Sequence, residues 1–262
     1  MSDILDDLAA SASERVKSGF YELEQSNKET KRFNSFVRRI KEINGEPIIA
    51  EVKIGSPSRG RFLSEGRSPN DLGRKYLEGG AAGLSVLTDP DHFFGSLENL
   101  EKMSRLNLPT LMKDFVLDFS QIKAGFVLGA SAILLIYRLF DRDYPTFTLK
   151  NAIDGAHQLG LEVLLETNDR SEYEKALDTN ADMIGINNRD LRSLEVDLSV
   201  TKNILDKLGK DRITWSMSGI TKREDIDYLN TAGADAFLVG TSLARAREPV
   251  IKLREMRGAI ND

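Results

Sequence analysis

Short apolar runs alternate with longer amphipathic stretches along almost the whole chain after residue 46. Eight of the runs are short and rich in Ile, Val or Leu, which is typical of strands that are buried on both faces of a parallel sheet. The predicted strands are Pro47–Lys53, Gly83–Leu87, Pro109–Lys113, Ala132–Tyr137, Glu162–Glu166, Met183–Ile186, Arg212–Ser216 and Ala236–Val239. Because helical patterns lie between them, the chain is predicted to belong to the α/β class.

Three of the intervening stretches begin with a helix start signal. Ser68 stands before Pro69, which predicts a serine cap with proline at the first helical position. Segments Ser171–Glu174 and Thr221–Glu224 have the spacing of capping boxes, in which the first and fourth side chains cap each other's backbone.

Eight strands that alternate with helices can form either a closed barrel or a large open sheet. A weak internal repeat separates these alternatives. Four helix-to-strand joints carry a Gly or Asn at an equivalent place, namely Gly80, Gly129, Asn180 and Gly233. Any parallel α/β protein can reuse such a joint, but a unit of two strands and two helices used four times favours a (β/α)8 TIM barrel.

Residues 1–46 precede the first predicted strand and have the pattern of two helices, roughly Asp3–Ser18 and Lys31–Asn44. Such an extension can cap the barrel floor or lie near its mouth. One barrel takes about 250 residues. We therefore expect the 262 residues to form a single domain, with a helical extension over 1–46 and a barrel over 47–262.

Composition narrows the classes of function. Hydrophobic residues make up 40% and charged residues 29% of the chain, as in ordinary globular proteins. Cysteine is absent, which excludes a disulfide scaffold, a thiolate metal site and a cysteine nucleophile. Two histidines argue against a histidine-rich metal centre, and a net charge of -5 argues against nucleic acid as a partner.

The amino-terminal segment has acidic residues where a signal peptide needs basic ones, and no apolar run is long enough to cross a membrane. We therefore expect a cytoplasmic monomer without a membrane partner.

Charged side chains occupy positions of the first strand that should face the barrel axis. Ile49, Glu51 and Lys53 share one face because side chains alternate along a strand. Two charges on that face are costly unless they are paired or functional, so they form either a structural ion pair or part of an active site.

Other polar residues follow strands three, five and six. Lys113 ends the third strand, Glu166 ends the fifth, and Asn187 and Arg189 follow the sixth. In a barrel these strand ends converge at the face where active sites form. Crowded lysines and carboxylates shift one another's pKa, so the sequence predicts acid–base chemistry at this face.

The loops after strands seven and eight suit a phosphate group. They contain Ser218 and Gly219 in one case and Gly240 and Thr241 in the other, at the two places where many barrels bind phosphate on backbone N–H groups. Each alone also fits a plain helix cap. No GxGxxG follows a strand, so no dinucleotide cofactor is expected.

Taken together, these segments resemble the indole-3-glycerol-phosphate synthase family, with a match that runs from about Pro47 to Leu243. The segments that carry the resemblance are Ile48–Gly60, Leu84–Asp89 with Phe93 and Gly95, Leu111–Phe115, Ile184–Leu191 and Leu238–Leu243. That family converts 1-(2-carboxyphenylamino)-1-deoxyribulose 5-phosphate into indole-3-glycerol phosphate, with loss of carbon dioxide and water and without a cofactor. The resemblance therefore implies a carboxy-lyase of tryptophan biosynthesis.

The resemblance also implies two sets of site residues. The catalytic set comprises Glu51, Lys53, Lys113, Glu166, Asn187 and Ser218. The substrate-binding set comprises Ser56, Phe93, Phe115, Leu134, Arg189, Leu191, Met217, Gly219, Gly240 and Thr241.

Within the catalytic set, the resemblance makes Lys113 and Lys53 acids that protonate the ketone oxygen and assist loss of the hydroxyl. Glu51 and Glu166 hold or deprotonate these groups and the ring intermediate, and the assignment of each carboxylate to a step stays open. Asn187 is expected to bind the sugar hydroxyls.

Within the binding set, Arg189 is expected to orient the site or the anthranilate carboxylate. The phosphate cradle implied by the family is Ser56, Gly219, Gly240 and Thr241. The implied slot for the aromatic ring is Phe93, Phe115, Leu134 and Leu191, of which Leu134 equally suits ordinary core packing.

One position departs from the family pattern. The seventh strand carries Met217 where the family usually has Glu, and a thioether can neither hold a proton nor accept a strong hydrogen bond. Either Glu51 and Glu166 carry the chemistry without it, or the enzyme is weakened, or the substitution was introduced. A second departure, at Ile54 and Gly55 where basic residues are common, alters the charge of the following loop.

Two rival functions stay open. One is another phosphosugar enzyme on the same scaffold, such as an isomerase or a Schiff-base aldolase that uses Lys53 or Lys113. The other, suggested by Met217, is a non-catalytic protein that binds a phosphate ligand.

Overall fold

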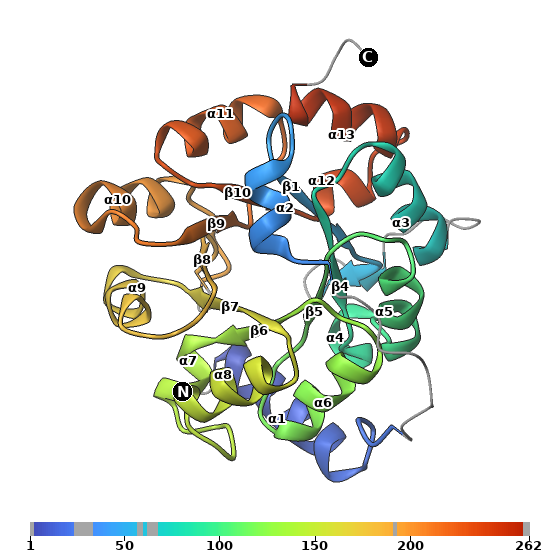
Figure 1. Ribbon diagram of the computed structural model, residues 1–262, viewed down its shortest axis with the longest axis vertical. Coiled ribbons are helices and arrows are strands. Elements are labelled where there is room, and N and C mark those ends of the chain that lie inside the picture. The colour runs from blue at the N-terminus through green and yellow to red at the C-terminus, as the bar shows by residue number, and fades with distance from the viewer. Residues whose placement is uncertain (1–2, 24–33, 57–59, 62–67, 191–192, 259–262) are drawn as a thin grey trace.

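Eight parallel strands close into a barrel in the computed structural model, which describes residues 3–23, 34–56, 60–61, 68–190, 193–258 (Figure 1). Around the barrel the strands follow the order β1-β10-β9-β8-β7-β6-β5-β4, and β4 pairs with β1 to complete it. Their bounds are β1 Ile48–Val52, β4 Gly83–Leu87, β5 Thr110–Lys113, β6 Ala132–Ile136, β7 Glu162–Thr167, β8 Met183–Asn187, β9 Ile213–Met217 and β10 Ala236–Val239. The predicted (β/α)8 TIM barrel is therefore confirmed.

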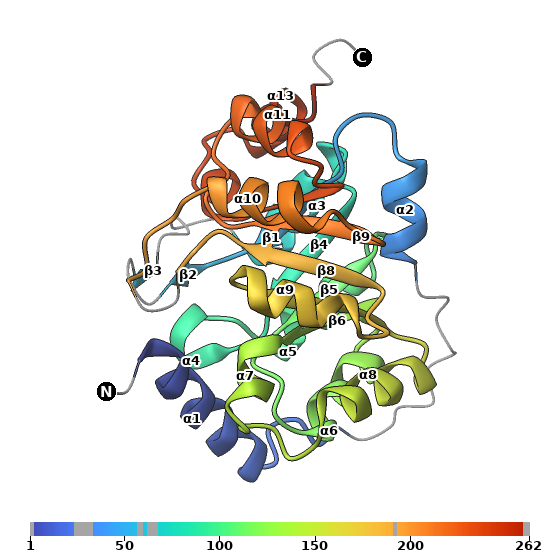
Figure 2. The ribbon, with the colours of Figure 1, turned by 90° about the vertical axis from the view of Figure 1, so that its left-hand side faces the viewer.

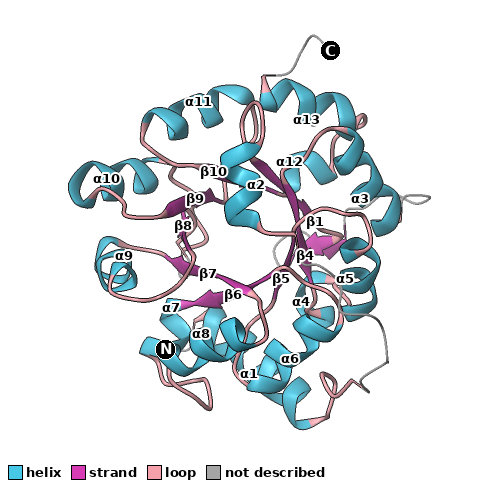
Figure 3. Cartoon of the chain, viewed as in Figure 1, coloured by secondary structure: helices cyan, strands magenta, loops and turns pink. Residues whose placement is uncertain are grey.

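Helices surround the strands on the outside of the barrel (Figure 3). The helices are α1 Ile4–Lys17, α2 Phe36–Glu42, α3 Pro69–Glu78, α4 Pro90–Phe93, α5 Leu97–Ser104, α6 Phe119–Val127, α7 Tyr137–Asp141, α8 Leu149–Gln158, α9 Arg170–Leu177, α10 Ser199–Leu208, α11 Arg223–Thr231, α12 Thr241–Ala244 and α13 Pro249–Arg257. A short antiparallel pair, β2 Gly55–Ser56 with β3 Gly60–Arg61, follows β1. Among the described residues, no helix combines the length and the apolar character that crossing a membrane requires.

The eight predicted strands are all present, with small shifts at their ends. The clearest shift is in the seventh strand, which begins at Ile213 and reaches Met217. Arg212 lies just before the strand, where its guanidinium donates to the carbonyls of Leu177 at the end of α9 and of Thr179 and Ala181 just after it.

One of the three predicted helix starts is confirmed as written. Ser68 caps α3 with Pro69 in the first turn. The other two are wrong in register, since α9 is capped by Asp169 and the N-cap position of α11 is Lys222. Asp169 caps α9, which therefore begins before Ser171. At α11, the Asp225 carboxylate accepts from backbone N–H groups on the preceding turn.

The glycines of the predicted repeat end helices as expected. Gly80, Gly129 and Gly233 have φ values of 82°, 82° and 100°, in the left-handed region that glycine tolerates best. Asn180 does not adopt this conformation, so the third joint of the repeat turns in another way.

Alternation along the strands separates two buried clusters. Ile48, Ala50 and Val52 of β1 point outward and pack under the surrounding helices. Ile49 points inward, where it joins Trp215, Met217 and other residues of the barrel interior. Glu51 and Lys53 are on this inward face, as the period of two predicted.

The two N-terminal helices lie at opposite ends of the barrel (Figure 2). Phe36 of α2 is fully buried and packs edge-on against Trp215, with ring centroids 5.2 Å apart, so α2 closes the floor. Glu162, at the start of β7, accepts the Phe36 backbone N–H at 2.7 Å and also the Ser35 hydroxyl, which fixes the start of α2. Burial raises the pKa of Glu162.

The first helix lies near the barrel mouth. Leu5, Ala9 and Ala12 of α1 belong to the same buried cluster as Leu117 and Leu134. The sequence left open whether the extension caps the barrel floor or lies near the mouth. Helix α2 does the first and helix α1 does the second.

The floor packing yields a stability prediction. Replacing Phe36 by Ala removes a buried ring and leaves a cavity against Trp215, so the free energy of unfolding should fall by about 3–5 kcal/mol. Urea denaturation followed by circular dichroism measures this. Ile251→Ala, at a side chain that is 55% exposed, is the surface control and should change it by no more than about 0.5 kcal/mol. If Phe36→Ala and Ile251→Ala lowered the free energy of unfolding equally, the idea that α2 closes the barrel floor would be wrong.

Candidate active site

A cavity of about 790 Å³ opens at the C-terminal ends of the barrel strands. Its size is that of a small-molecule site. Thirteen of the sixteen residues predicted for the site line it: Glu51, Lys53, Phe93, Lys113, Phe115, Leu134, Glu166, Asn187, Arg189, Ser218, Gly219, Gly240 and Thr241. Leu191 and the side chain of Ser56 lie outside the described residues.

Met217 is the exception among the described residues, because it is not on the cavity wall. Its side chain is 1% exposed and packs in the barrel interior. A methyl group added at Gly185 would lie 2.7 Å from the Met217 sulfur, so the thioether fills space that this glycine leaves open. The expectation that Met217 contacts substrate is therefore corrected: it lies beneath the site.

Glu51 is the centre of the charged part of the site. Its carboxylate is 3% exposed and contacts two ammonium groups, Lys113 Nζ at 2.8 Å and Lys53 Nζ at 3.3 Å. Burial alone raises the pKa of Glu51, but the charges of Lys113 and Lys53 outweigh burial and lower the pKa to about 2. Glu51 is therefore ionised at neutral pH.

The same contact keeps Lys113 protonated. Burial lowers the pKa of Lys113, but the charges of Glu51 and Glu166 act more strongly and raise it above its ordinary value. Lys113 is thus an ammonium ion whose proton faces the cavity beside a buried carboxylate.

Glu166 has a different environment. Its carboxylate accepts a hydrogen bond from the Asn187 side-chain amide at 2.8 Å. The Asn187 side-chain oxygen Oδ1 in turn accepts the Arg189 backbone N–H at 3.0 Å, which sets the orientation of the side-chain amide. Burial raises the pKa of Glu166, and the charge of Lys113 and the Asn187 bond only partly oppose this. The two carboxylates of the site therefore have pKa values that are shifted in opposite directions.

An apolar wall faces the charged groups. The rings of Phe93 and Phe115 have centroids 6.1 Å apart, and Lys53 Nζ lies 5.7 Å from the Phe93 centroid. Leu134 and Ile136 continue this wall along β6. An aromatic ligand ring can pack here with its polar substituents turned toward the lysines.

The loop after β9 has an unusual backbone. Ser218 has φ 69° and Gly219 has φ 86°, so two successive residues adopt the left-handed region. For a non-glycine residue this costs about 1–3 kcal/mol, and such strain is concentrated at functional sites. A side chain at Gly219 would also collide with Val196, since its first carbon would lie 2.3 Å from Val196 Cγ1.

The loop after β10 approaches the charged groups closely. A methyl group at Gly240 would lie 2.6 Å from Glu51 Oε1. Gly240 therefore does two things: it lets the backbone reach the cavity, and it leaves room for the Glu51 carboxylate.

Sequence reasoning missed two contributions to the site. Ile4, Leu5 and Leu8 of α1 line the cavity, and only the amphipathic pattern of that helix hinted at a buried face. Asn188, next to Asn187, is buried and donates to the Met217 carbonyl at 3.0 Å, so it ties the ends of β8 and β9 together.

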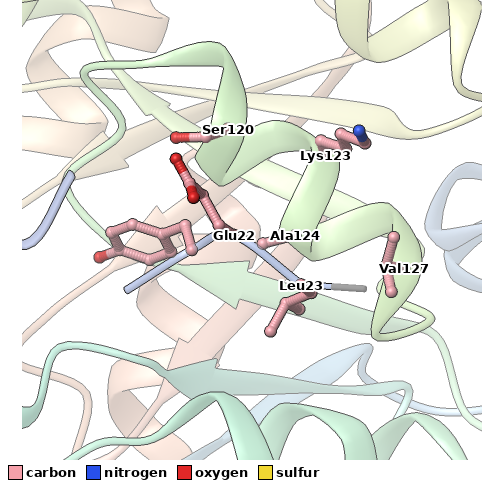
Figure 4. A pocket seen from close by; sticks show the side chains of 7 residues that line it. Glu22, Leu23, Ser120, Lys123, Ala124 and Val127 are labelled. Atoms are coloured by element: carbon pink, nitrogen blue, oxygen red, sulfur yellow. The ribbon is translucent and has the colours of Figure 1, made fainter. Parts of the chain in front are cut away.

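A smaller cavity of about 160 Å³ lies between the chain after α1 and helix α6 (Figure 4). Figure 4 shows the Lys123 side chain pointing away from Glu22 and Ser120, so its polar groups do not converge. The described part of the chain contains no group of three or more His, Asp or Glu side chains placed to hold a metal ion.

Comparisons with known proteins show the family of the chain. The family model for indole-3-glycerol phosphate synthase matches residues 2–256. The indole-3-glycerol phosphate synthase of Burkholderia vietnamiensis is 41% identical over 265 residues, covering 98% of this chain and 99% of that protein. The Burkholderia multivorans enzyme of the same name is 40% identical with the same coverage.

Solved structures that share the fold are more distant. A thiamine phosphate pyrophosphorylase from Pyrococcus furiosus has a TM-score of 0.62 at 15% identity, covering 85% of this chain and 96% of that one. The N-acetylmannosamine-6-phosphate 2-epimerase of Clostridium perfringens has a TM-score of 0.60 at 12% identity, covering 81% and 92%. These show the barrel fold alone. The full-length family match, with 41% identity across 98% of the sequence, shows that the chain belongs to the indole-3-glycerol phosphate synthase family.

Proposed function

We propose that this chain closes and aromatises the indole ring of indole-3-glycerol phosphate without a cofactor. The observation that carries the proposal is the pairing of two ammonium groups on one buried carboxylate, Glu51, with a separate carboxylate of raised pKa, Glu166, facing the same cavity. This arrangement offers acids and a base together at neutral pH.

In the first step, the ring carbon that bears the carboxylate attacks the ketone carbon, and a carbon–carbon bond forms. The ketone oxygen gains charge and takes a proton from Lys113. Carbon dioxide then leaves, and its bonding electrons restore the aromatic ring. Lys113 suits this role because its ammonium faces the cavity and is held by Glu51 at 2.8 Å.

In the second step, the hydroxyl formed from the ketone departs as water after protonation by Lys53, and a base removes a proton to complete the indole. We assign Glu166 as this base. It is the carboxylate that the described lysines do not contact directly, and its raised pKa makes it a better proton acceptor than Glu51.

The phosphate is assigned to the N–H groups of the loops after β9 and β10, with Gly219 and Gly240 allowing close approach. The carboxyphenyl ring is assigned to the wall of Phe93, Phe115 and Leu134. Binding energy from the phosphate then helps to orient the reacting carbons. We propose a monomer that acts on this small phosphorylated substrate.

A second candidate is a relative that binds the phosphate ligand without turning it over, and Met217 is the observation that favours it. We prefer the enzyme, because Glu51 and Glu166 both reach the cavity and Met217 lies below it.

Turnover tests the assignment of Lys113. Lys113→Gln should lower kcat by about 100- to 10,000-fold, the range for loss of a general acid. Fluorescence of the indole product measures the rate from the carboxyphenylamino-deoxyribulose phosphate. The exposed Lys102, replaced by Gln, is the control and should retain full activity. A Lys113→Gln rate within threefold of the parent would contradict the role of Lys113.

The pKa of Glu166 predicts the pH dependence. A base must be ionised, and burial raises this pKa above the ordinary 4.5, so kcat should increase with pH through a value above 4.5 and then level off. The pH dependence of kcat is the quantity to measure, because it reports the pKa values of groups in the enzyme–substrate complex. Glu98→Gln, at a carboxylate of α5 that is 70% exposed and lies outside the cavity, should keep the same pH dependence of kcat. An acid limb at or below 4.5 would exclude Glu166 as the base.

Met217 separates the two candidates. We expect the unaltered chain to turn over substrate, because its acids and base do not include position 217. Met217→Glu places a carboxylate in the barrel interior and should lower the melting temperature, since burial of a charge is costly. Met217→Leu, similar in volume, should change neither property. An inactive parent chain whose activity is restored by Met217→Glu would instead show a scaffold that lacks one catalytic carboxylate.

A further inference from the structure

A buried polar cluster beneath α1 is not used by the reaction described above. Arg15, on the last turn of α1, is 7% exposed although it carries a charge. Its guanidinium contacts three carboxylates: Asp91 at 2.6 Å, Asp89 at 3.4 Å and Asp114 at 3.5 Å. Asp89 and Asp114 are both buried, so Arg15 compensates charges that water does not reach.

Asp114 is the most completely bonded member of the cluster. Besides Arg15, its carboxylate accepts from the Tyr21 hydroxyl at 2.8 Å, the Thr88 hydroxyl at 2.6 Å and the Phe115 backbone N–H at 2.8 Å. Asp114 is part of the cavity lining, but its side chain is 0% exposed, so its oxygens are turned to the cluster.

The position of Asp114 in the chain gives the cluster its importance. It directly follows Lys113 and directly precedes Phe115, and both of these face the cavity. The Thr88 backbone N–H also donates to the Lys113 carbonyl at 3.2 Å, so the ends of β4 and β5 are held together at this point. Three consecutive residues thus belong to three parts of the site. Lys113 is the proposed acid, Asp114 is part of the buried cluster, and Phe115 is part of the aromatic wall.

We infer that Arg15 is a positioning residue of the active site: through Asp114 it fixes the end of β5, and with it the Lys113 ammonium and the Phe115 ring. The inference rests on the proposed function. It also gives the N-terminal extension a part in catalysis that is distinct from covering the barrel.

The alternative is that Arg15 only attaches α1 to the barrel. A second attachment of the same helix allows this to be tested. Arg142 contacts Asp3 at 2.7 Å and Asp6 at 2.6 Å, at the N-cap and in the first turn of α1, whereas Arg15 is on its last turn. A variant at Arg142 loosens the helix and leaves the Asp114 cluster in place.

The experiment compares Arg15→Met, Asp114→Asn and Arg142→Met in the full chain, after circular dichroism has shown that each is folded at the assay temperature. Small displacements of a catalytic group lower rates by up to about 100-fold. We expect Arg15→Met and Asp114→Asn each to lower kcat about 10- to 100-fold with KM changed less than threefold. The double variant should be no slower than the slower single variant, because both act through one cluster. Arg142→Met should keep kcat within threefold of the parent, and because Ile4 and Leu5 at that end of α1 line the cavity, its effect is expected in KM instead.

A second readout does not require activity. Reductive methylation of the folded chain, followed by peptide mass spectrometry, reports how accessible the Lys113 amine is. Its rate should rise severalfold in Arg15→Met and Asp114→Asn and stay unchanged in Arg142→Met. Asp114→Asn preserves volume, so it still tests the inference if Arg15→Met does not fold.

Two results would overturn the inference: equal losses of kcat in Arg15→Met and Arg142→Met, or an unchanged Lys113 methylation rate in the cluster variants. A parent chain without turnover is a different result. It would contradict the proposed function, while the methylation rates would still decide whether Arg15 positions Lys113.

Discussion

The contact between the Glu51 carboxylate and two lysine ammonium groups is the interaction on which the site depends. An ionised carboxylate that is 3% exposed is strongly unfavourable without partners, and here Lys113 and Lys53 both neutralise it. The barrel makes this possible, because β1 and β5, which do not pair with each other, point side chains at one axis. Gly240 leaves the space that the carboxylate occupies.

Closure at both ends of the barrel supports this interaction. At the floor, Phe36 of α2 packs on Trp215, and the N-terminus of α2 bonds to Glu162. At the mouth, α1 lines the cavity with Leu5 and Leu8. A low local dielectric strengthens the contact between Glu51 and its lysines, and it also raises the pKa of Glu166, which has no such partner among the described side chains. One apolar setting therefore accompanies both the raised pKa of Lys113, the proposed acid, and the raised pKa of Glu166, the proposed base.

Much of the barrel could be predicted from the sequence, because its signals are local. The period of two along β1 placed Ile49, Glu51 and Lys53 on the inward face, and the structure has Ile49 in the interior cluster. The ends of parallel strands meet by topology, so the convergence of Lys113 and Glu166 followed once a barrel was expected.

Other features depend on contacts between distant residues and could not be predicted in this way. One miss was local: Asp169 rather than Ser171 caps α9, because the Asp169 carboxylate accepts the Glu172 backbone N–H at 3.0 Å, so two overlapping cap signals lay side by side in the sequence. The resemblance implied a carboxylate and a contact with substrate at position 217, but Met217 is buried below the cavity, where its sulfur fills space that Gly185 leaves open. The location of α1 depends on pairs such as Arg15 with Asp114, which are far apart in the sequence.

The most direct test of the account is a crystal structure with a substrate analogue in which the ketone is reduced to an alcohol. We predict that the alcohol oxygen lies within hydrogen-bond distance of Lys113 Nζ, with Lys113 still bonded to Glu51. We also predict the carboxyphenyl ring beside Phe93 and Phe115, and the phosphate on the loops at Gly219 and Gly240. An analogue bound with its oxygen away from both lysines, or with Glu51 released from them, would contradict the central role of this carboxylate.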